Sequence, residues 1–228
     1  MLFAGTCLGI CEKEGFVSMT CGYQQQLEAI KKALPNYEDA KRIDHTLGVL
    51  EECIWMAETF GLSDEDRTAL FTAALLHDIT KAKTDNEQLA LCEKYGICLP
   101  QDVSSVISTL HQYTGAPFAR EIFGKETVCD KVYSAIACHT TGKAGMSVID
   151  KMLFAADFTE PGRKYRSCAE MREYLHGECG KINKNDKAAL YRLLDDTVKR
   201  IIGFTVTYLI EKGRKIDAEM LSAWNAMV

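Results

Sequence analysis

The sequence predicts an all-α protein built as a single helical domain. Three observations support this fold class: apolar residues recur three and four positions apart, period-2 alternation is rare, and only four prolines interrupt 228 residues. No internal repeat, low-complexity tract or linker is evident, and a chain of this length can bury one large core. We expect residues 23–228 to form the domain and residues 1–22 to be a poorly ordered extension, with Met19 as an alternative start.

The first predicted helix carries an apolar stripe along residues 43–57 and stops at Gly61, a residue typical of helix ends. A second helix begins after Ser63, which lies three residues before an aspartate in a capping-box pattern. This helix continues through a nearly unbroken apolar run towards His77. The two segments therefore predict two successive helices.

The middle of the chain carries two further stripes, each leading to a histidine. Residues 103–110 form one stripe that ends at His111, and we expect the segment 114–117 (TGAP) to break the chain after it. Residues 128–135 form the next stripe and lead at helical spacing to His139. The residues that follow His139 are expected to form a loop.

The last third of the chain predicts three helices. Ser147 repeats the capping pattern before a helix that ends at Pro161-Gly162. A long helix is expected over residues 186–211 and a short one over residues 217–227. Apolar positions on the long helix could pack a homodimer.

Composition bounds the partners and the compartment. A net charge of −5 argues against nucleic-acid binding, and the short apolar start lacks the basic segment of a signal peptide and cannot span a membrane. The ten cysteines contain no CxxC pair, which favours reduced thiols over a zinc ribbon. We therefore expect a cytoplasmic protein that binds neither nucleic acid nor membrane. The composition still allows a small-molecule partner such as a nucleotide, which needs only a local basic patch.

Four of the five histidines occur in the same kind of place in the sequence. His45, His77, His111 and His139 each lie beside an apolar stripe near a predicted helix end, and Asp78 follows His77 directly. A lone histidine on an apolar face is usually a satisfied core residue. Burying an imidazole beside a carboxylate is costly, however, unless a metal ion compensates both groups.

A second carboxylate, Asp157, is predicted to point inward from an apolar helix, where its expected partner is a metal ion or an arginine. Histidine and aspartate together suit iron, manganese or zinc. Four histidines and two aspartates suffice for two ions, in which a shared carboxylate bridges the metals. Composition alone leaves one ion and two ions equally open.

Phosphate recognition would need cations and polar donors near these ligands. The Thr140–Gly142 loop offers hydroxyl and backbone N–H donors. Each basic residue has the alternative of being a solvated surface charge. The candidate cations are Lys81, Lys143, Arg163, Lys164 and Arg166.

The ordered ligand set resembles a known signature. His45, His77-Asp78 and Asp157 resemble the H…HD…D pattern of the HD-domain superfamily. Longer strings are similar to the YqeK family: DHTLGVLEEC (44–53), AALLHDITK (73–81) and CHTTGKAGMSVIDKMLFAADFTEPGR (138–163). The resemblance covers about residues 24–210 and leaves the N-terminal extension without a counterpart.

This resemblance implies a metal-dependent phosphohydrolase that splits diadenosine tetraphosphate symmetrically into two ADP, with iron as the favoured metal and manganese or zinc as alternatives. The implied first-metal ligands are His45, His77, Asp78 and Asp157, while His111 and His139 hold or approach a second metal. Asp78, Lys81 and Arg163 are the implied catalytic residues. Substrate contacts are implied for Lys81, His111, His139, Thr140, Thr141, Gly142 and Arg163.

Three alternatives remain at this point. An HD phosphohydrolase could act on another nucleotide, such as a dNTP, a nucleoside monophosphate or an alarmone, with the same ligands. A non-catalytic module could sense nucleotides or metal. A structural all-α scaffold would leave the His77-Asp78 pair and Asp157 unexplained.

Overall fold

The computed structural model describes residues 21–228, and within this range the chain forms helices and turns without any strand. The predicted all-α class is confirmed. Of the predicted extension only Cys21 and Gly22 are described, and both belong to the first helix. The α-helices are α1 (Cys21–Ala33), α2 (Ala40–Phe60), α3 (Asp64–Leu76), α4 (Asp85–Lys94), α5 (Leu110–Thr127), α6 (Asp130–Ile136), α7 (Val148–Thr159), α8 (Arg166–Cys179), α9 (Lys187–Glu211) and α10 (Ala218–Asn225). Three 3₁₀ helices are η2 (Leu34–Asn36), η3 (Val103–Ser105) and η4 (Ile107–Thr109).

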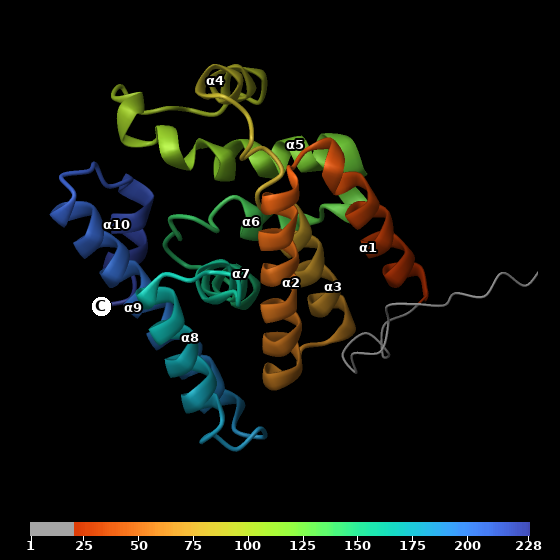
Figure 1. Ribbon diagram of the computed structural model, residues 1–228, viewed down its shortest axis with the longest axis vertical. Helices are drawn as coiled ribbons and strands as arrows, with labels where there is room; N and C mark the ends of the chain where they lie inside the picture. Colours follow the sequence, from red (N-terminus) through yellow and green to blue (C-terminus); the bar gives the residue numbers. More distant parts are fainter. Residues whose placement is uncertain (1–20) are drawn as a thin grey trace, which may run out of the picture.

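Helix α7 is the centre of the bundle. Figure 1 shows it end-on, with α2 and α3 on one side and α8 and α9 on the other. It packs against α2, α3, α6, α8 and α9, so almost every face of this helix meets another helix. This explains why its sequence, VIDKMLFAADFT, is apolar around most of its circumference. None of the described helices is both long and apolar enough to cross a membrane.

The predicted end of α2, the predicted start of α3 and both predicted ends of α7 are confirmed. Gly61 ends α2 in the left-handed conformation (φ 64°), which glycine adopts without strain. Ser63 accepts a hydrogen bond from the Asp66 N–H at the start of α3. Ser147 and Asp150 form a capping box before α7, and this helix ends at Thr159, two residues before Pro161.

The predicted break at residues 114–117 is wrong, because α5 runs through it. Gly115 and Ala116 bring this helix close to α3 and α6: a Cβ on Gly115 would lie 3.4 Å from Ile136 and 3.5 Å from the His77 carbonyl oxygen. Close packing of these small residues outweighs the weak helix propensity of the TGAP segment. The stripe at residues 103–110 also differs from a regular helix, since it forms the 3₁₀ helices η3 and η4.

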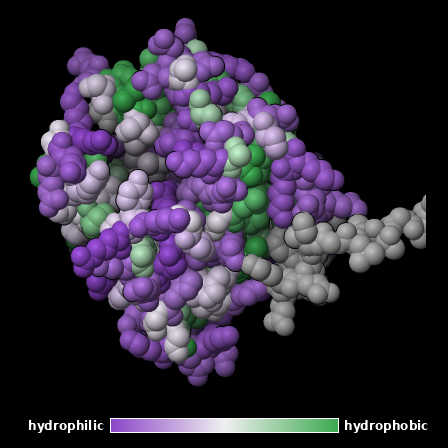
Figure 2. All heavy atoms as spheres, viewed as in Figure 1, coloured by the Kyte–Doolittle hydropathy of each residue, from purple (hydrophilic) through white to green (hydrophobic). Residues whose placement is uncertain are grey.

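The surface around the centre of the molecule is polar. Figure 2 shows a mostly hydrophilic face with a hydrophobic strip between α1 and α2 and smaller hydrophobic patches elsewhere. On α9, Phe204 and Tyr208 are 43% and 41% exposed, one helical turn apart. These are exposed apolar positions of the kind from which a homodimer was predicted, and the homodimer remains a prediction.

Candidate metal centre

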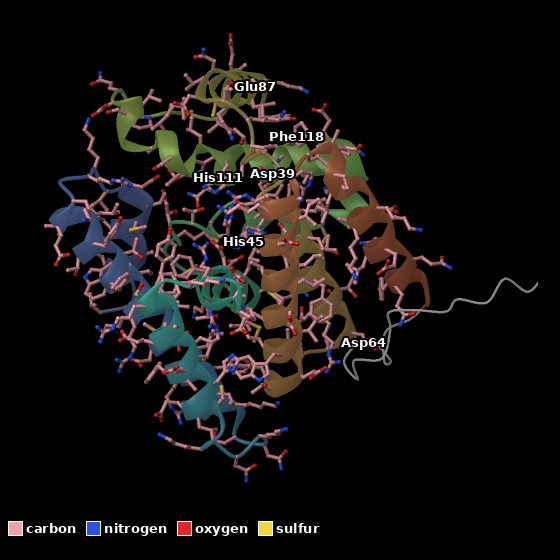
Figure 3. All side chains as sticks on the ribbon, in the orientation of Figure 1. Asp39, His45, Asp64, Glu87, His111 and Phe118 are labelled. Atoms are coloured by element: carbon pink, nitrogen blue, oxygen red, sulfur yellow. The ribbon has the colours of Figure 1, made fainter. Side chains whose placement is uncertain are left out.

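Six ligand-type side chains converge where α2, α3, α5, α6 and α7 meet. Figure 3 shows His45 and His111 pointing into this central region from α2 and α5. His77 ends α3 and Asp78 follows it; His139 lies in the turn after α6, and Asp157 lies on α7. The fifth histidine, His176, lies elsewhere: its Nε2 is 2.9 Å from Glu52 and its ring stacks on Trp55.

One group of ligands surrounds His45. Its Nε2 lies 3.1 Å from Asp157 Oδ1 and 3.4 Å from His77 Nε2. His77 Nε2 is in turn 4.0 Å from Asp157 Oδ1. These three side chains place one nitrogen or oxygen each within 4.8 Å of the others, which is close enough to bind one ion.

A second group of ligands lies on the other side of Asp78. His111 Nε2 and His139 Nε2 are 3.2 Å apart, and they lie 3.4 and 3.5 Å from Asp78 Oδ1. The other carboxylate oxygen, Oδ2, lies 3.6 Å from His77 Nε2. Asp78 therefore presents one oxygen to each group, which is the arrangement that a bridging carboxylate between two metal ions requires.

The histidine rings are oriented for metal binding by their Nδ1 atoms. His77 and His139 lie 2.8 Å through Nδ1 from the carbonyl oxygens of Ala74 and Ile136. A carbonyl oxygen only accepts, so each Nδ1 carries the proton and each Nε2 offers its lone pair to the cluster. Burial lowers the pKa of His77 to about 4, so this imidazole stays neutral near pH 7.

His45 is oriented by a side chain instead. Its Nδ1 lies 3.2 Å from Oε1 of Glu160, a carboxylate that is only 3% exposed. Burial lowers the pKa of His45, but hydrogen bonds with Asp157 and Glu160 outweigh this effect and raise it to about 9. Glu160 is held in turn by the Gly162 N–H, and Arg172 of α8 binds its backbone carbonyl.

This donor set fits a transition metal. Two imidazoles present their Nε2 atoms, the buried carboxylate of Asp78 and the half-buried one of Asp157 converge with them, and imidazole with carboxylate suits iron, manganese or zinc. His45, His77, Asp78 and Asp157 would hold one ion, and Asp78, His111 and His139 a second. Such ions would polarise a phosphoryl oxygen and activate a water molecule.

Two of the predicted cations lie at this centre. Lys81 Nζ lies 3.1 Å from His111 Nε2, and Arg163 Nη2 is 2.5 Å from Asp157 Oδ1. A metal ion or an arginine was the expected partner of Asp157, and Arg163 pairs with it. Lys143 instead bonds Ser134 and pairs with Asp150, and Arg166 pairs with Glu170 on the surface.

The loop after His139 is folded onto a buried glutamine. Gln112, which is fully buried, accepts the backbone N–H groups of Thr140 and Thr141 and donates to Thr141 Oγ1. Gly142 N–H bonds the Cys138 carbonyl. The backbone donors that the sequence offered to a phosphate are therefore committed within the protein, while Thr140 Oγ1 lies 3.0 Å from His111 Nε2, inside the centre.

Three residues of the centre were not predicted from the sequence: Arg42, Gln112 and Glu160. Arg42 lies one helical turn before His45, and its Nη1 is 2.7 Å from Asp78 Oδ2. That spacing on one helix face is a signal that could have found it. Gln112 follows His111 and looks like any buried polar residue, so the sequence carries no signal for it.

A glycine on α2 makes room for Glu160. A Cβ on Gly48 would lie 2.5 Å from Glu160 Oε2. A Gly48→Ala substitution is therefore expected to displace this carboxylate from His45 and to weaken Mn²⁺ binding about tenfold, the lower range for loss of a group that orients a ligand. Competition with a fluorescent chelator measures this affinity.

The matched control is Gly177→Ala on α8, where a Cβ would meet nothing within 4 Å. That variant should keep Mn²⁺ affinity and gain up to about 1 kcal/mol in the free energy of unfolding from helix propensity. If Gly48→Ala behaved like Gly177→Ala in both measurements, Glu160 would have no part in orienting His45.

Comparison with known proteins identifies the family of this chain. Residues 42–174, more than half of the chain, match the family model of the HD domain. The chain therefore belongs to the HD-domain family. A solved HD superfamily hydrolase from Clostridium acetobutylicum shares the fold, with a TM-score of 0.71 at 24% identity over 88% of this chain and 95% of that one.

Within that family the chain is similar to symmetrical bis(5'-nucleosyl)-tetraphosphatases. The enzyme of Halalkalibacterium halodurans is 31% identical over 82% of this chain and 89% of its own length. Those of Staphylococcus aureus and Bacillus subtilis are 28% and 26% identical, covering 87% and 90% of this chain and 93% and 97% of their own lengths. The predicted family resemblance is confirmed.

Proposed function

We propose that this protein is a metal-dependent phosphohydrolase that cleaves dinucleoside tetraphosphates symmetrically and converts diadenosine tetraphosphate into two ADP. The observation that carries the proposal is the position of Asp78, with one oxygen towards His77 and the other towards His111 and His139. The similarity to three symmetrical tetraphosphatases over most of the chain supports the substrate class.

Side chains around the cluster supply groups that would bind the phosphates of the substrate and balance their negative charge. Lys81 and Arg163 bring positive charge to opposite sides of the cluster, beside His111 and Asp157. Fixed cations of this kind stabilise the charge that develops on a phosphoryl group in the transition state. The Thr140 hydroxyl supplies a neutral donor beside His111. With Asp78 these are the residues to which we assign catalysis and phosphate binding.

Iron is the proposed metal, with two ions as the full complement, and the proposed compartment is the cytoplasm. Support for iron comes from the mixed set of imidazole and carboxylate ligands, which manganese and zinc also accept. Support for two ions comes from Asp78, which presents one carboxylate oxygen to the group of His45, His77 and Asp157 and the other to His111 and His139. Metal analysis of protein purified without added metal measures both identity and stoichiometry.

The experiment that tests the substrate is product analysis. The purified protein, with its metal content measured, is incubated with diadenosine tetraphosphate, and anion-exchange chromatography resolves the nucleotides. We expect ADP as the sole product, loss of the reaction on chelation, and recovery with Fe²⁺ or Mn²⁺.

AMP with ATP would contradict symmetrical cleavage while keeping a metal-dependent hydrolase. Absence of turnover by protein with a full metal complement would contradict the substrate itself. Other nucleotides or a sensing role would then replace this proposal.

A further inference from the structure

Arg42 contacts the carboxylate that both ligand groups share. It comes from the first turn of α2, and its Nη1 lies 2.7 Å from Asp78 Oδ2. The carboxylate is 5% exposed, whereas the arginine side chain is 34% exposed. Arg42 therefore binds a buried carboxylate while its own side chain remains partly exposed to solvent.

The Arg42 contact competes with the proposed use of Asp78. Oδ2 is the oxygen that faces the His45 and His77 group, at 3.9 and 3.6 Å from their Nε2 atoms. A metal ion held by this group would carry positive charge, as the Arg42 guanidinium does. Both would contact the same oxygen, Asp78 Oδ2, and would repel each other. Because the Arg42 side chain is long and already 34% exposed, it can turn away from Asp78 towards solvent without a rearrangement of the helices.

We propose that Arg42 binds a phosphate of the substrate, and that its guanidinium exchanges Asp78 for this phosphate when the metal centre is filled. The planar fork of arginine matches phosphate as well as carboxylate, so one side chain can serve both partners. This assignment rests on the proposed nucleotide hydrolase function. It adds to Lys81 and Arg163 a third cation, on the α2 side of the centre.

A competing destination for Arg42 lies nearby. Glu38 is 5% exposed, and its Oε1 has no hydrogen-bond partner among the described residues, while Oε2 accepts from Thr46. Burial raises the pKa of Glu38 to about 7, and the positive charge of Arg42 acts in the opposite direction. If Arg42 moved only to Glu38, replacing Arg42 would not change the affinity of the protein for phosphate. Measuring phosphate binding therefore distinguishes the two destinations.

The test measures Mn²⁺ and ADP binding without turnover in the full chain. Arg42→Gln is compared with wild type, with Arg42→Lys, which keeps the charge but loses the fork, and with Lys41→Gln, which removes an exposed charge from the same helix turn. Arg42→Gln should bind Mn²⁺ several-fold more tightly, because a competitor for Asp78 is gone. With Mn²⁺ saturating, it should bind ADP about tenfold more weakly, the loss expected for a charged hydrogen bond.

Arg42→Lys should fall between wild type and Arg42→Gln for ADP, and Lys41→Gln should match wild type for both ligands. Weaker Mn²⁺ binding by Arg42→Gln would overturn the exchange and make Arg42 a support for Asp78. Unchanged ADP affinity, or no ADP binding by metal-loaded wild type, would overturn the phosphate contact. Wild type that binds ADP but leaves diadenosine tetraphosphate intact would contradict the proposed substrate, not the exchange.

Discussion

An Asp78→Asn variant is expected to lose activity on diadenosine tetraphosphate by at least about 10³-fold and to be purified with less metal. The side chain keeps its shape but retains one carbonyl oxygen and no charge, so it can no longer face both ligand groups as an acceptor. Metal ions supply several kcal/mol of transition-state stabilisation, and each 1.4 kcal/mol corresponds to a factor of ten in rate. Initial rates at saturating substrate, with metal analysis of the same sample, measure the effect.

Asp44→Asn is the matched control for this substitution. Asp44 directly precedes His45 but is exposed on the outer side of α2. It should keep both activity and metal content, because the same chemical change is made outside the centre. Wild-type activity in Asp78→Asn would remove the bridging carboxylate from the mechanism.

In a Gln112→Leu variant the free energy of unfolding is expected to be about 2–4 kcal/mol lower than in wild type. Leucine fills a similar volume but leaves the N–H groups of Thr140 and Thr141 without the acceptor that now lies 3.0 and 3.1 Å away. An unsatisfied buried donor costs about 1–3 kcal/mol. Urea unfolding monitored by circular dichroism gives the change in the free energy of unfolding.

The same variant should also lose activity, since Gln112 fixes the loop that carries Thr140 beside His111. Gln101→Leu, at an exposed position of the chain, provides the control and should change stability by no more than about 0.5 kcal/mol. A Gln112→Leu protein as stable as this control would mean that the loop holds its conformation without the glutamine.

Two of the candidate ligand positions carry a local signal in the sequence. His77-Asp78 directly follows an apolar run, and Asp157 follows the buried Ala155 and Ala156. The helix boundaries near them carry capping residues with known geometry, as at Ser63 and Ser147. Their convergence is a tertiary property, and it was inferred through the family resemblance rather than from periodicity.

The remaining features depend on contacts that no local pattern encodes. Helices α1, α4 and α8 were not predicted, and their sequences are more polar than that of α7, so their apolar stripes are narrow. The helix through TGAP forms because Gly115 and Ala116 meet neighbouring helices closely. Arg42 contacts Asp78, which is 36 positions away in the sequence, and Gln112 contacts Thr140, which is 28 positions away. The roles of both residues therefore depend on the tertiary fold.

The anchoring of the histidine rings has a consequence for the evolution of this centre. His77 and His139 are oriented by main-chain carbonyls three residues before them. Such carbonyls are present whatever side chains occupy positions 74 and 136, so drift at these positions leaves both rings aligned. His45 depends on the carboxylate of Glu160, more than a hundred residues away in the chain. A mutation at Glu160 can therefore change the orientation of His45, whereas the orientations of His77 and His139 do not depend on any single side chain.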